Sequence, residues 1–419
     1  MMRAMGRATL ASACLLAAAP LCWAQAPPRQ TQDDDYTRYE LQAPGSAQFR
    51  ILYEVTATTP GAPFFFNVIR KGSVATDERV IDLATGQRLK WEVVSGVQAR
   101  TEGHPTADVD AEWIKVYLAR PVPQGGETRL LIDKTYTDAK SYFQDGDAVV
   151  FDRSLGIRRN AVVLPSGYRL LSLNVPAQVL ATPDGRVMVS FLNTSAAAAP
   201  LVIRARPGLP TFTPALPTAP GPAVAAPRRS HAARLVDRAH DNGELVYDLG
   251  DPATHRYQRT LDDTTDRPGV DAYVDAVVPG ASISAPSARN LDTGEALAVE
   301  VSSGAELAAR QGAGQATLAA DARAVVVRFP PVADGRSTRV RVTATVTDKA
   351  RYSLDGDELV WDGILDRNRT VVVLPAGWTI VGSSMPVTIG TDGDGRQRLR
   401  FENARPDEMQ ALVRARRVR

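Results

Sequence analysis

Apolar and polar residues alternate with a period of two through most of the chain. The clearest example is the segment 339–346, RVRVTATV, in which small apolar residues alternate with arginine and threonine. Successive side chains of a β-strand point to opposite faces of a sheet, so this period predicts half-buried strands. A similar alternation marks four further segments: 49–53, 64–68, 114–118 and 187–191.

Turn signals separate these segments. Asp-Gly pairs occur at 145–146 and 184–185, and Thr-Gly occurs at 85–86. Glycine adopts the positive φ that tight hairpins need, and aspartate tolerates it better than most residues. About ten short strands in roughly 170 residues predict an all-β fold, either an antiparallel sandwich or a saddle- or barrel-like form. Helix is expected only as a short turn near 305–311.

The strand pattern occurs twice. Residues 39–206 can be laid over 247–416 almost without gaps, at an offset of 208 that later becomes 210. Residues 135–165 match 345–375 at 15 of 31 positions. The chain therefore predicts two tandem homologous β domains that each close around their own core.

Composition sets the boundaries of these domains. Seven prolines lie between 207 and 227 among alanine, threonine and glycine, which predicts an extended, semi-rigid Pro/Ala-rich linker. The expected organisation is a signal peptide at 1–26, a flexible N-terminus at 27–38, a first β domain at 39–206, a linker at 207–242 and a second β domain at 243–419.

The first 26 residues have the pattern of an export signal. Arg3 and Arg7 precede an apolar run, and Ala24-Gln25-Ala26 provides a small-x-small cleavage site, so we expect a cut after Ala26. The alternative is a lipoprotein anchored through Cys14 or Cys22. Cleavage predicts a cysteine-free product in a bacterial periplasm or the medium.

Charge and hydropathy narrow the expected partners. The expected mature chain has 47 basic and 47 acidic residues, which gives no electrostatic drive toward nucleic acid or anionic lipid. No later segment has 18 consecutive apolar residues, so we expect no membrane insertion. The expected partner is a peptide, a glycan or another protein.

The most similar stretch of the two repeats supplies the candidate site residues. Each copy has a tyrosine, an Asp-Gly-Asp turn, a strand that ends in an aromatic residue and aspartate, and a loop that ends in arginine. One interpretation is structural, with aspartate and arginine paired across the mouth of the loop. The other interpretation has these side chains lining a ligand groove. The candidate binding residues are Tyr142, Asp152 and Arg159 in the first copy, and Tyr352, Asp362 and Arg369 in the second.

Motifs for catalysis or cofactor binding were sought without a match. The four histidines lack the spacing of a zinc cage, and there is no nucleophile elbow, phosphate-binding glycine loop or His-Glu-x-x-His segment. The Asp-Gly-Asp-Gly run at 392–395 lacks the later glutamate of a calcium loop. We therefore expect no catalytic residue, no metal and no cofactor. Carboxylates from separate strands remain an alternative source of acid/base chemistry.

Four segments carry a family resemblance: FFFNV at 64–68, DLATGQRL at 82–89, IKVYL at 114–118 and LLIDKTY at 130–136. In this order they resemble the non-catalytic N-terminal β domain of zinc aminopeptidases, over about 75 residues of each repeat. That family's zinc-binding helix and its glutamate have no counterpart here. The resemblance therefore implies a β-saddle or sandwich shape and carries no catalytic residue over.

Two functions follow from these observations. The first is an exported, non-catalytic protein whose twin β domains bind or position an envelope or extracellular partner. The second is a secreted hydrolase whose carboxylates come from separate strands. Trp91, Trp113 and the 64–66 phenylalanines occur only in the first repeat, so they form either an exposed aromatic binding surface there or part of its core.

Overall fold

The computed structural model describes residues 29–418 except 196, 209–236, 311–317 and 406. Nearly every element in these ranges is a β-strand. The remaining elements are helices α1 (Gly96–Thr101) and α2 (Gly304–Arg310) and the single-turn 3-10 helix η1 (Pro252–Thr254). The predicted all-β class is confirmed, and α2 lies where the short helical turn was expected.

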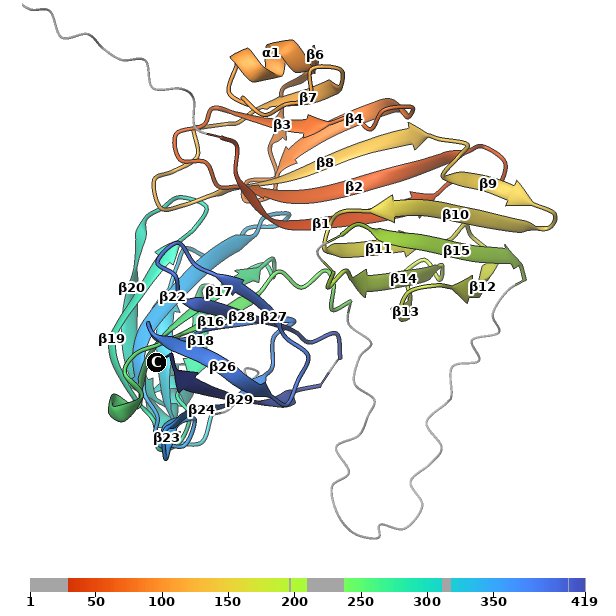
Figure 1. Cartoon of the computed structure of the whole chain (residues 1–419). Coiled ribbons are helices and arrows are strands. Elements are labelled where there is room, and N and C mark those ends of the chain that lie inside the picture. The colour runs from red at the N-terminus through yellow and green to blue at the C-terminus, as the bar shows by residue number, and fades with distance from the viewer. Residues whose placement is uncertain (1–28, 196, 209–236, 311–317, 406, 419) are drawn as a thin grey trace, which may run out of the picture.

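The first half of the chain forms three sheets (Figure 1). The largest has eight strands in the order β13-β14-β11-β1-β2-β8-β4-β5, and the others have the orders β12-β15-β10-β9 and β3-β7-β6. The strands are β1 (Gln32–Leu41), β2 (Gln48–Ala57), β3 (Phe64–Val68), β4 (Val74–Asp82), β5 (Arg88–Leu89), β6 (Trp91–Ser95), β7 (Glu112–Tyr117), β8 (Thr128–Thr137), β9 (Tyr142–Asp145), β10 (Ala148–Leu155), β11 (Arg159–Val163), β12 (Tyr168–Leu173), β13 (Gln178–Ala181), β14 (Val187–Leu192) and β15 (Ala199–Pro207).

The second half forms two sheets. One has ten strands in the order β18-β21-β20-β19-β22-β17-β16-β25-β28-β27, and the other has the order β23-β24-β29-β26. The strands are β16 (Glu244–Leu249), β17 (Arg256–Thr265), β18 (Ala272–Ala276), β19 (Ser282–Asn290), β20 (Ala296–Ser303), β21 (Arg323–Arg328), β22 (Thr338–Thr347), β23 (Tyr352–Asp355), β24 (Glu358–Leu365), β25 (Arg369–Val373), β26 (Trp378–Ser383), β27 (Thr388–Thr391), β28 (Gln397–Glu402) and β29 (Met409–Arg417).

The two halves repeat one strand order. The run β14-β11-β1-β2-β8-β4 in the first large sheet corresponds to β28-β25-β16-β17-β22-β19 in the second, and β12-β15-β10-β9 corresponds to β26-β29-β24-β23. Each large sheet also contains one parallel pair, β1 with β11 and β16 with β25. The sheets are thus mixed rather than wholly antiparallel. In each half the first strand has its parallel partner much later in the chain. Parallel pairing requires such a long crossover connection.

Each half encloses its own apolar core. In the first half the large sheet and the four-stranded sheet meet through Phe49 and Phe151, whose ring centroids are 5.5 Å apart in an edge-to-face arrangement. In the second half Tyr247 and Trp361 lie 5.2 Å apart, a contact equivalent to that of Tyr39 with Phe151 in the first half. The alternating segment 339–346 forms most of β22, where the valines and Ala344 are buried as its period predicts.

The N-terminal segment departs from expectation. Strand β1 begins at Gln32, so residues 32–38 are not part of a flexible N-terminus. Tyr36 is buried and pairs with Arg159 in the parallel register, which the sequence pattern of QDDDY does not reveal. Asp34 of this segment pairs with Arg339 and Arg369 of the second half, whereas Tyr36 packs in an apolar cluster with Ala161 and Val163.

The expected linker also contains a packed segment. Residues 209–236 lie outside the described part of the chain, but 237–242 contact both halves. Arg159 donates to the carbonyl of His240 at 3.0 Å, and Asn368 donates to the carbonyl of Arg238 at 2.8 Å. The end of the expected spacer therefore joins the two halves directly.

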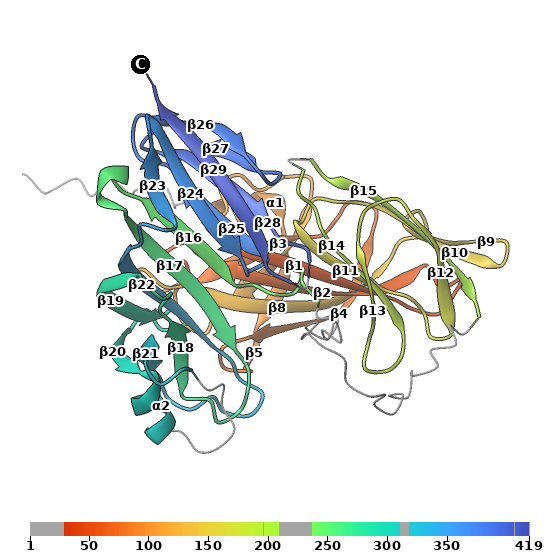
Figure 2. The same ribbon diagram turned by 90° about the horizontal axis from the view of Figure 1, so that it is seen from below.

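The halves, which Figure 2 shows from below, also meet through matched loops. The amide of Glu127 donates to the carbonyl of Leu291 at 2.8 Å, and the hydroxyl of Ser337 donates to the carbonyl of Leu83 at 2.8 Å. Leu83 and Leu291 occupy equivalent positions in the two repeats, as do Glu127 and Ser337. The contact is therefore approximately twofold symmetric.

Candidate functional site

The two candidate tyrosines are structural. Tyr142 and Tyr352 are buried, and their hydroxyls donate to the carbonyls of Gln42 at 3.0 Å and Gly250 at 2.7 Å. Burial raises the pKa of both phenols, so they remain hydrogen-bond donors at neutral pH. Each one fixes the loop after the first strand of its half.

The expected pair between Asp152 and Arg159 is wrong. Asp152 points outward from β10 and is exposed, whereas Arg159 is buried against the other half. Arg159 donates to the carbonyls of Ala239 at 3.2 Å and His240 at 3.0 Å, and its guanidinium lies over the ring of Tyr36. The two residues lie on strands of different sheets, β10 and β11, which their spacing along the chain does not show.

The expected pair between Asp362 and Arg369 is also wrong. Arg369 is buried and pairs with Asp34 of the first half, which a second arginine of the second half, Arg339, also contacts. Burial alone would raise the pKa of Asp34, but the two arginines outweigh it and hold the pKa well below its usual range. Arg159 and Arg369 therefore join the halves, and the pocket of about 160 Å³ that both of them line contains neither Asp152 nor Asp362.

The aromatic residues of the first half form core rather than surface. Phe65, Phe66 and Trp113 are buried, and Trp91 is partly buried against the main core. His104 stacks on Phe66 and meets the edge of Trp113 with ring centroids 4.8 Å apart. The alternative of an exposed aromatic binding surface is overturned.

Asp362 lines a larger cavity than the pocket of about 160 Å³ that Arg159 and Arg369 share. Two adjoining pockets of about 460 and 290 Å³ share Val278, Arg351, Ile364 and Glu408, and we call their union the β24 groove. Its other lining residues used below are Leu245, Tyr247, Tyr257, Arg259, Asp275, Ala281, Ile283, Val346, Asp348, Asp362, Asp366, Met409 and Gln410. This size is typical of small-molecule and peptide side-chain sites.

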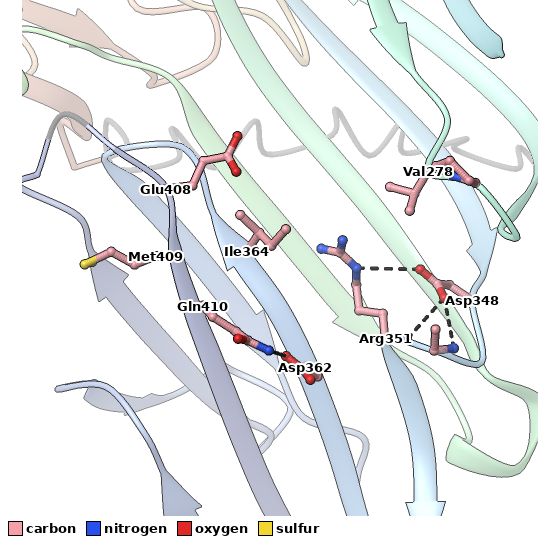
Figure 3. Close-up of a pocket in the computed structure, with 10 residues that line it drawn as sticks. Val278, Asp348, Arg351, Asp362, Ile364, Glu408, Met409 and Gln410 are labelled. Atoms are coloured by element: carbon pink, nitrogen blue, oxygen red, sulfur yellow. Dashed lines mark hydrogen bonds and ion pairs between the residues drawn. The ribbon is translucent and has the colours of Figure 1, made fainter. Parts of the chain in front are cut away.

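Figure 3 shows the outer part of the β24 groove. Arg351 pairs with Asp348, with 3.6 Å between Nε and Oδ2, and Gln410 donates to Asp362 at 2.9 Å. Ile364 and Val278 face the same space and are 42% and 48% exposed. The mouth of the groove thus combines exposed aliphatic side chains with carboxylates.

The floor of the groove is aromatic and polar. Arg351 donates to the hydroxyl of Tyr247 at 3.1 Å, and Arg259 forms a partly buried ion pair with Asp275. Tyr257 is 3% exposed and lines the cavity, and within the described residues its hydroxyl has no hydrogen-bond partner. Burial raises the pKa of Tyr257, so this hydroxyl is a neutral donor directed at the groove.

Two substitutions between the repeats lie in or beside the groove. The equivalents of Val346 and Gly363 are Tyr136 and Arg153 in the first half. Arg153 is buried there, lies over the ring of Tyr136 at 5.7 Å and pairs with Asp138 at 3.0 Å. Val346 lines the groove where the first half has the larger Tyr136, whereas the ring of Trp361 takes the space beside Gly363.

Buried cations have also changed position between the repeats. In the first half Arg153 bonds Asp138, and in the second Arg351 bonds the equivalent Asp348 while glycine replaces the arginine on the strand. A β-carbon on Gly363 would lie 2.2 Å from the ring of Trp361, which replaces the smaller Phe151.

A second exchange involves neighbouring strands. Lys134 of β8 donates to Asn67 in the first half, whereas Arg259 pairs with Asp275, the equivalent of Asn67, in the second. Lys134 pairs in register with Ile51, the equivalent of Arg259. The sequence signal for the groove is a charged residue that is lost at one position of a repeat and gained at a neighbouring position. A position-by-position comparison of the two repeats reveals it.

Metal sites and membrane-spanning helices are the two further features considered for the described residues. No group of three or more histidine, cysteine, aspartate or glutamate side chains among them has an arrangement suited to a metal ion. No helix in the same residues is long and apolar enough to cross a membrane.

Comparison with known proteins gives similarity to structures only. No family model matches the chain, and no curated protein does. Part of the chain is similar to part of zinc metallopeptidases of the M1 family. One is from Deinococcus radiodurans, with 12% identity over 43% of this chain and 43% of that one and a TM-score of 0.28.

Two further structures are similar to the same extent. An aminopeptidase N family protein from Idiomarina loihiensis is 13% identical over 41% of this chain and 29% of its own, with a TM-score of 0.26. A proposed nutrient-binding protein from Legionella pneumophila is 9% identical over 43% of this chain and 68% of its own, with a TM-score of 0.26. The chain thus matches less than half the length of the aminopeptidase structures.

Proposed function

We propose that this chain is an exported, non-catalytic binding protein that holds a peptide, glycan or protein partner in the β24 groove. One observation carries the proposal. The two halves share a strand order, yet the second has a groove beside Val346, where the first half carries the larger Tyr136 packed under Arg153. On this proposal the repeats arose by duplication, and the second copy became the binding copy.

The contacts between the halves support a rigid platform. Asp34 pairs with arginines of the second half, and Arg129 of the first half pairs with Asp292 of the second at 2.7 Å. Buried charges that pair across an interface resist its opening, because separation leaves each charge without its partner. The first half then serves to anchor and orient the binding half.

A photocrosslinking experiment tests this function. A photoreactive phenylalanine at Ile364, on the groove, is compared with one at the equivalent Ser154 of the first half, which is also exposed. In periplasmic extract we expect a discrete crosslinked partner from the Ile364 position alone. Equal crosslinking from both positions, or none from either, contradicts the proposed function.

An activity screen separates binding from the hydrolase alternative. The purified chain from residue 27 onward is incubated with peptide and glycan libraries, and products are measured by mass spectrometry. We expect binding without turnover. Turnover that is lost in Asp362→Asn and kept in the equivalent Asp152→Asn would overturn the non-catalytic assignment.

A further inference from the structure

The β24 groove has an uncompensated negative charge. Five carboxylates line it, from Asp275, Asp348, Asp362, Asp366 and Glu408, against two guanidinium groups, from Arg259 and Arg351, which leaves a formal charge of −3. Both arginines are already paired, with Asp275 and Asp348 respectively.

The unpaired charge lies at the mouth. Asp366 and Glu408 are exposed, and among the residues that the structure describes neither carboxylate pairs with a cationic side chain. Asp362 is held by the neutral amide of Gln410. Carboxylates beside a concave, partly apolar surface attract a cation more strongly than carboxylates on an open surface, because the low-dielectric wall reduces solvent screening.

The interior of the groove supplies two other recognition elements. Val346, Ile283 and Ile364 form an aliphatic wall, and the hydroxyl of Tyr257 lacks an acceptor within the described residues. A ligand oxygen at this position would accept the hydrogen bond that water otherwise accepts from this hydroxyl. The site therefore offers a cation site, an apolar surface and one hydrogen-bond donor.

We infer, on the basis of the proposed function, that the ligand of the β24 groove is a basic peptide segment. An aliphatic or aromatic side chain packs on Val346 and Ile283, a backbone carbonyl accepts from Tyr257, and a lysine or arginine side chain pairs with Asp366 and Glu408. Glycans lack the cation, and acidic or neutral peptides leave the carboxylates unpaired. All three elements together match a peptide in which a basic residue neighbours a large apolar one.

Binding of synthetic peptides tests the inference. The probe is a fluorescein-labelled hexapeptide with two lysines that flank a phenylalanine, and its comparison peptides carry acetyl-lysine or glutamate in place of lysine. We expect the basic peptide to bind, the acetylated one to bind at least tenfold more weakly, and rising salt to weaken binding of the basic peptide alone. Asp366→Asn and Glu408→Gln should each weaken binding by about 2–5-fold, the usual range for exposed ion pairs.

Controls separate failure of the inference from failure of the proposed function. Asp152→Asn removes the same charge outside the groove and should leave binding unchanged. Val346→Tyr introduces the residue that the first half has at this position, fills the groove and should abolish binding. If this change in the core prevents folding, Ala281→Phe, in a loop at the groove, fills it instead. The acetylated or acidic peptide could bind as well as the basic one, and Val346→Tyr or Ala281→Phe could abolish that binding. In that case the groove function stands and the basic-peptide inference is wrong. If no probe binds, or filling the groove has no effect on binding, both are wrong.

Discussion

Arg129 of β8 in the first half donates two hydrogen bonds to Asp292 of the second half, at 2.7 and 2.9 Å. Both side chains are buried, and Asp292 also accepts from the amide of Arg339 at 2.9 Å. The planar guanidinium and the carboxylate are joined by two hydrogen bonds, so the pair fixes both the distance and the relative orientation of the two side chains. The equivalent residue to Arg129 in the second half is Arg339, which pairs with Asp34, so equivalent arginines of the two repeats each reach across the interface.

Arg129→Ala should destabilise the protein by about 3–5 kcal/mol, because it leaves Asp292 buried without its partner. Urea unfolding measures the loss, and small-angle scattering should show a larger radius of gyration as the halves separate. Arg405→Ala breaks an exposed pair with Asp407 and is the matched control, for which we expect no change in either measurement. A change in stability below about 1 kcal/mol for Arg129→Ala would show that the pair does not hold the halves together.

Glu127 should make stability depend on pH. Burial raises its pKa to about 7, although Arg339 lies 3.3 Å away and opposes the shift. The folded pKa lies above the unfolded value of 4.5, so the stabilising contribution is complete below that value and is lost as pH rises through about 7. We expect the free energy of unfolding to fall over this window by on the order of 1–3 kcal/mol.

Glu127→Gln should flatten this dependence, since glutamine resembles the protonated carboxyl. The urea midpoint measured from about pH 5 to pH 8 gives the comparison, with Glu112→Gln at an exposed position as control. A variant whose slope equals that of the parent protein would exclude Glu127 as the titrating group.

Tyr142 and Tyr352 should behave alike on loss of their hydroxyls. Each phenylalanine variant leaves a backbone carbonyl, of Gln42 or Gly250, without its donor, and we expect a loss of about 1–2 kcal/mol in each. Thermal unfolding measures the loss, and binding to the β24 groove should be unchanged. Weaker ligand binding at full stability would instead support the role of these tyrosines in a ligand groove.

The strands and turns were predictable because they depend on local patterns. Alternation identified β22, and Gly146 and Gly185 adopt φ of +65° and +80° at the predicted hairpin turns. The period of two and the positive φ are both set by a few neighbouring residues. The repeat could likewise be predicted by comparing the sequence with itself.

The partners of the charged residues were not predictable in this way. Arg159 and Arg369 were expected to pair with aspartates seven positions away, and the structure places both on Asp34 and the backbone between the halves. Asp34 is 125 positions from Arg159 and 335 from Arg369, so no local rule connects them. The first residues of strand β1 were missed for the same reason, because Asp34 pairs with arginines of the second half and Tyr36 packs on residues more than 120 positions away.

The last prediction concerns Gly363, Trp361 and Arg351, beside the groove, and their exchange for the residues of the first half. Gly363→Arg alone should destabilise the protein by about 1–3 kcal/mol, because a β-carbon there lies 2.2 Å from the ring of Trp361. Adding Trp361→Phe and Arg351→Ser reproduces the first-half set of Phe151, Arg153 and Ser141, and should recover most of the loss. Urea unfolding measures recovery, and loss of peptide binding in the stable triple variant shows that the groove has closed. If the triple variant remains as unstable as Gly363→Arg, the two halves do not share an interchangeable core at this position.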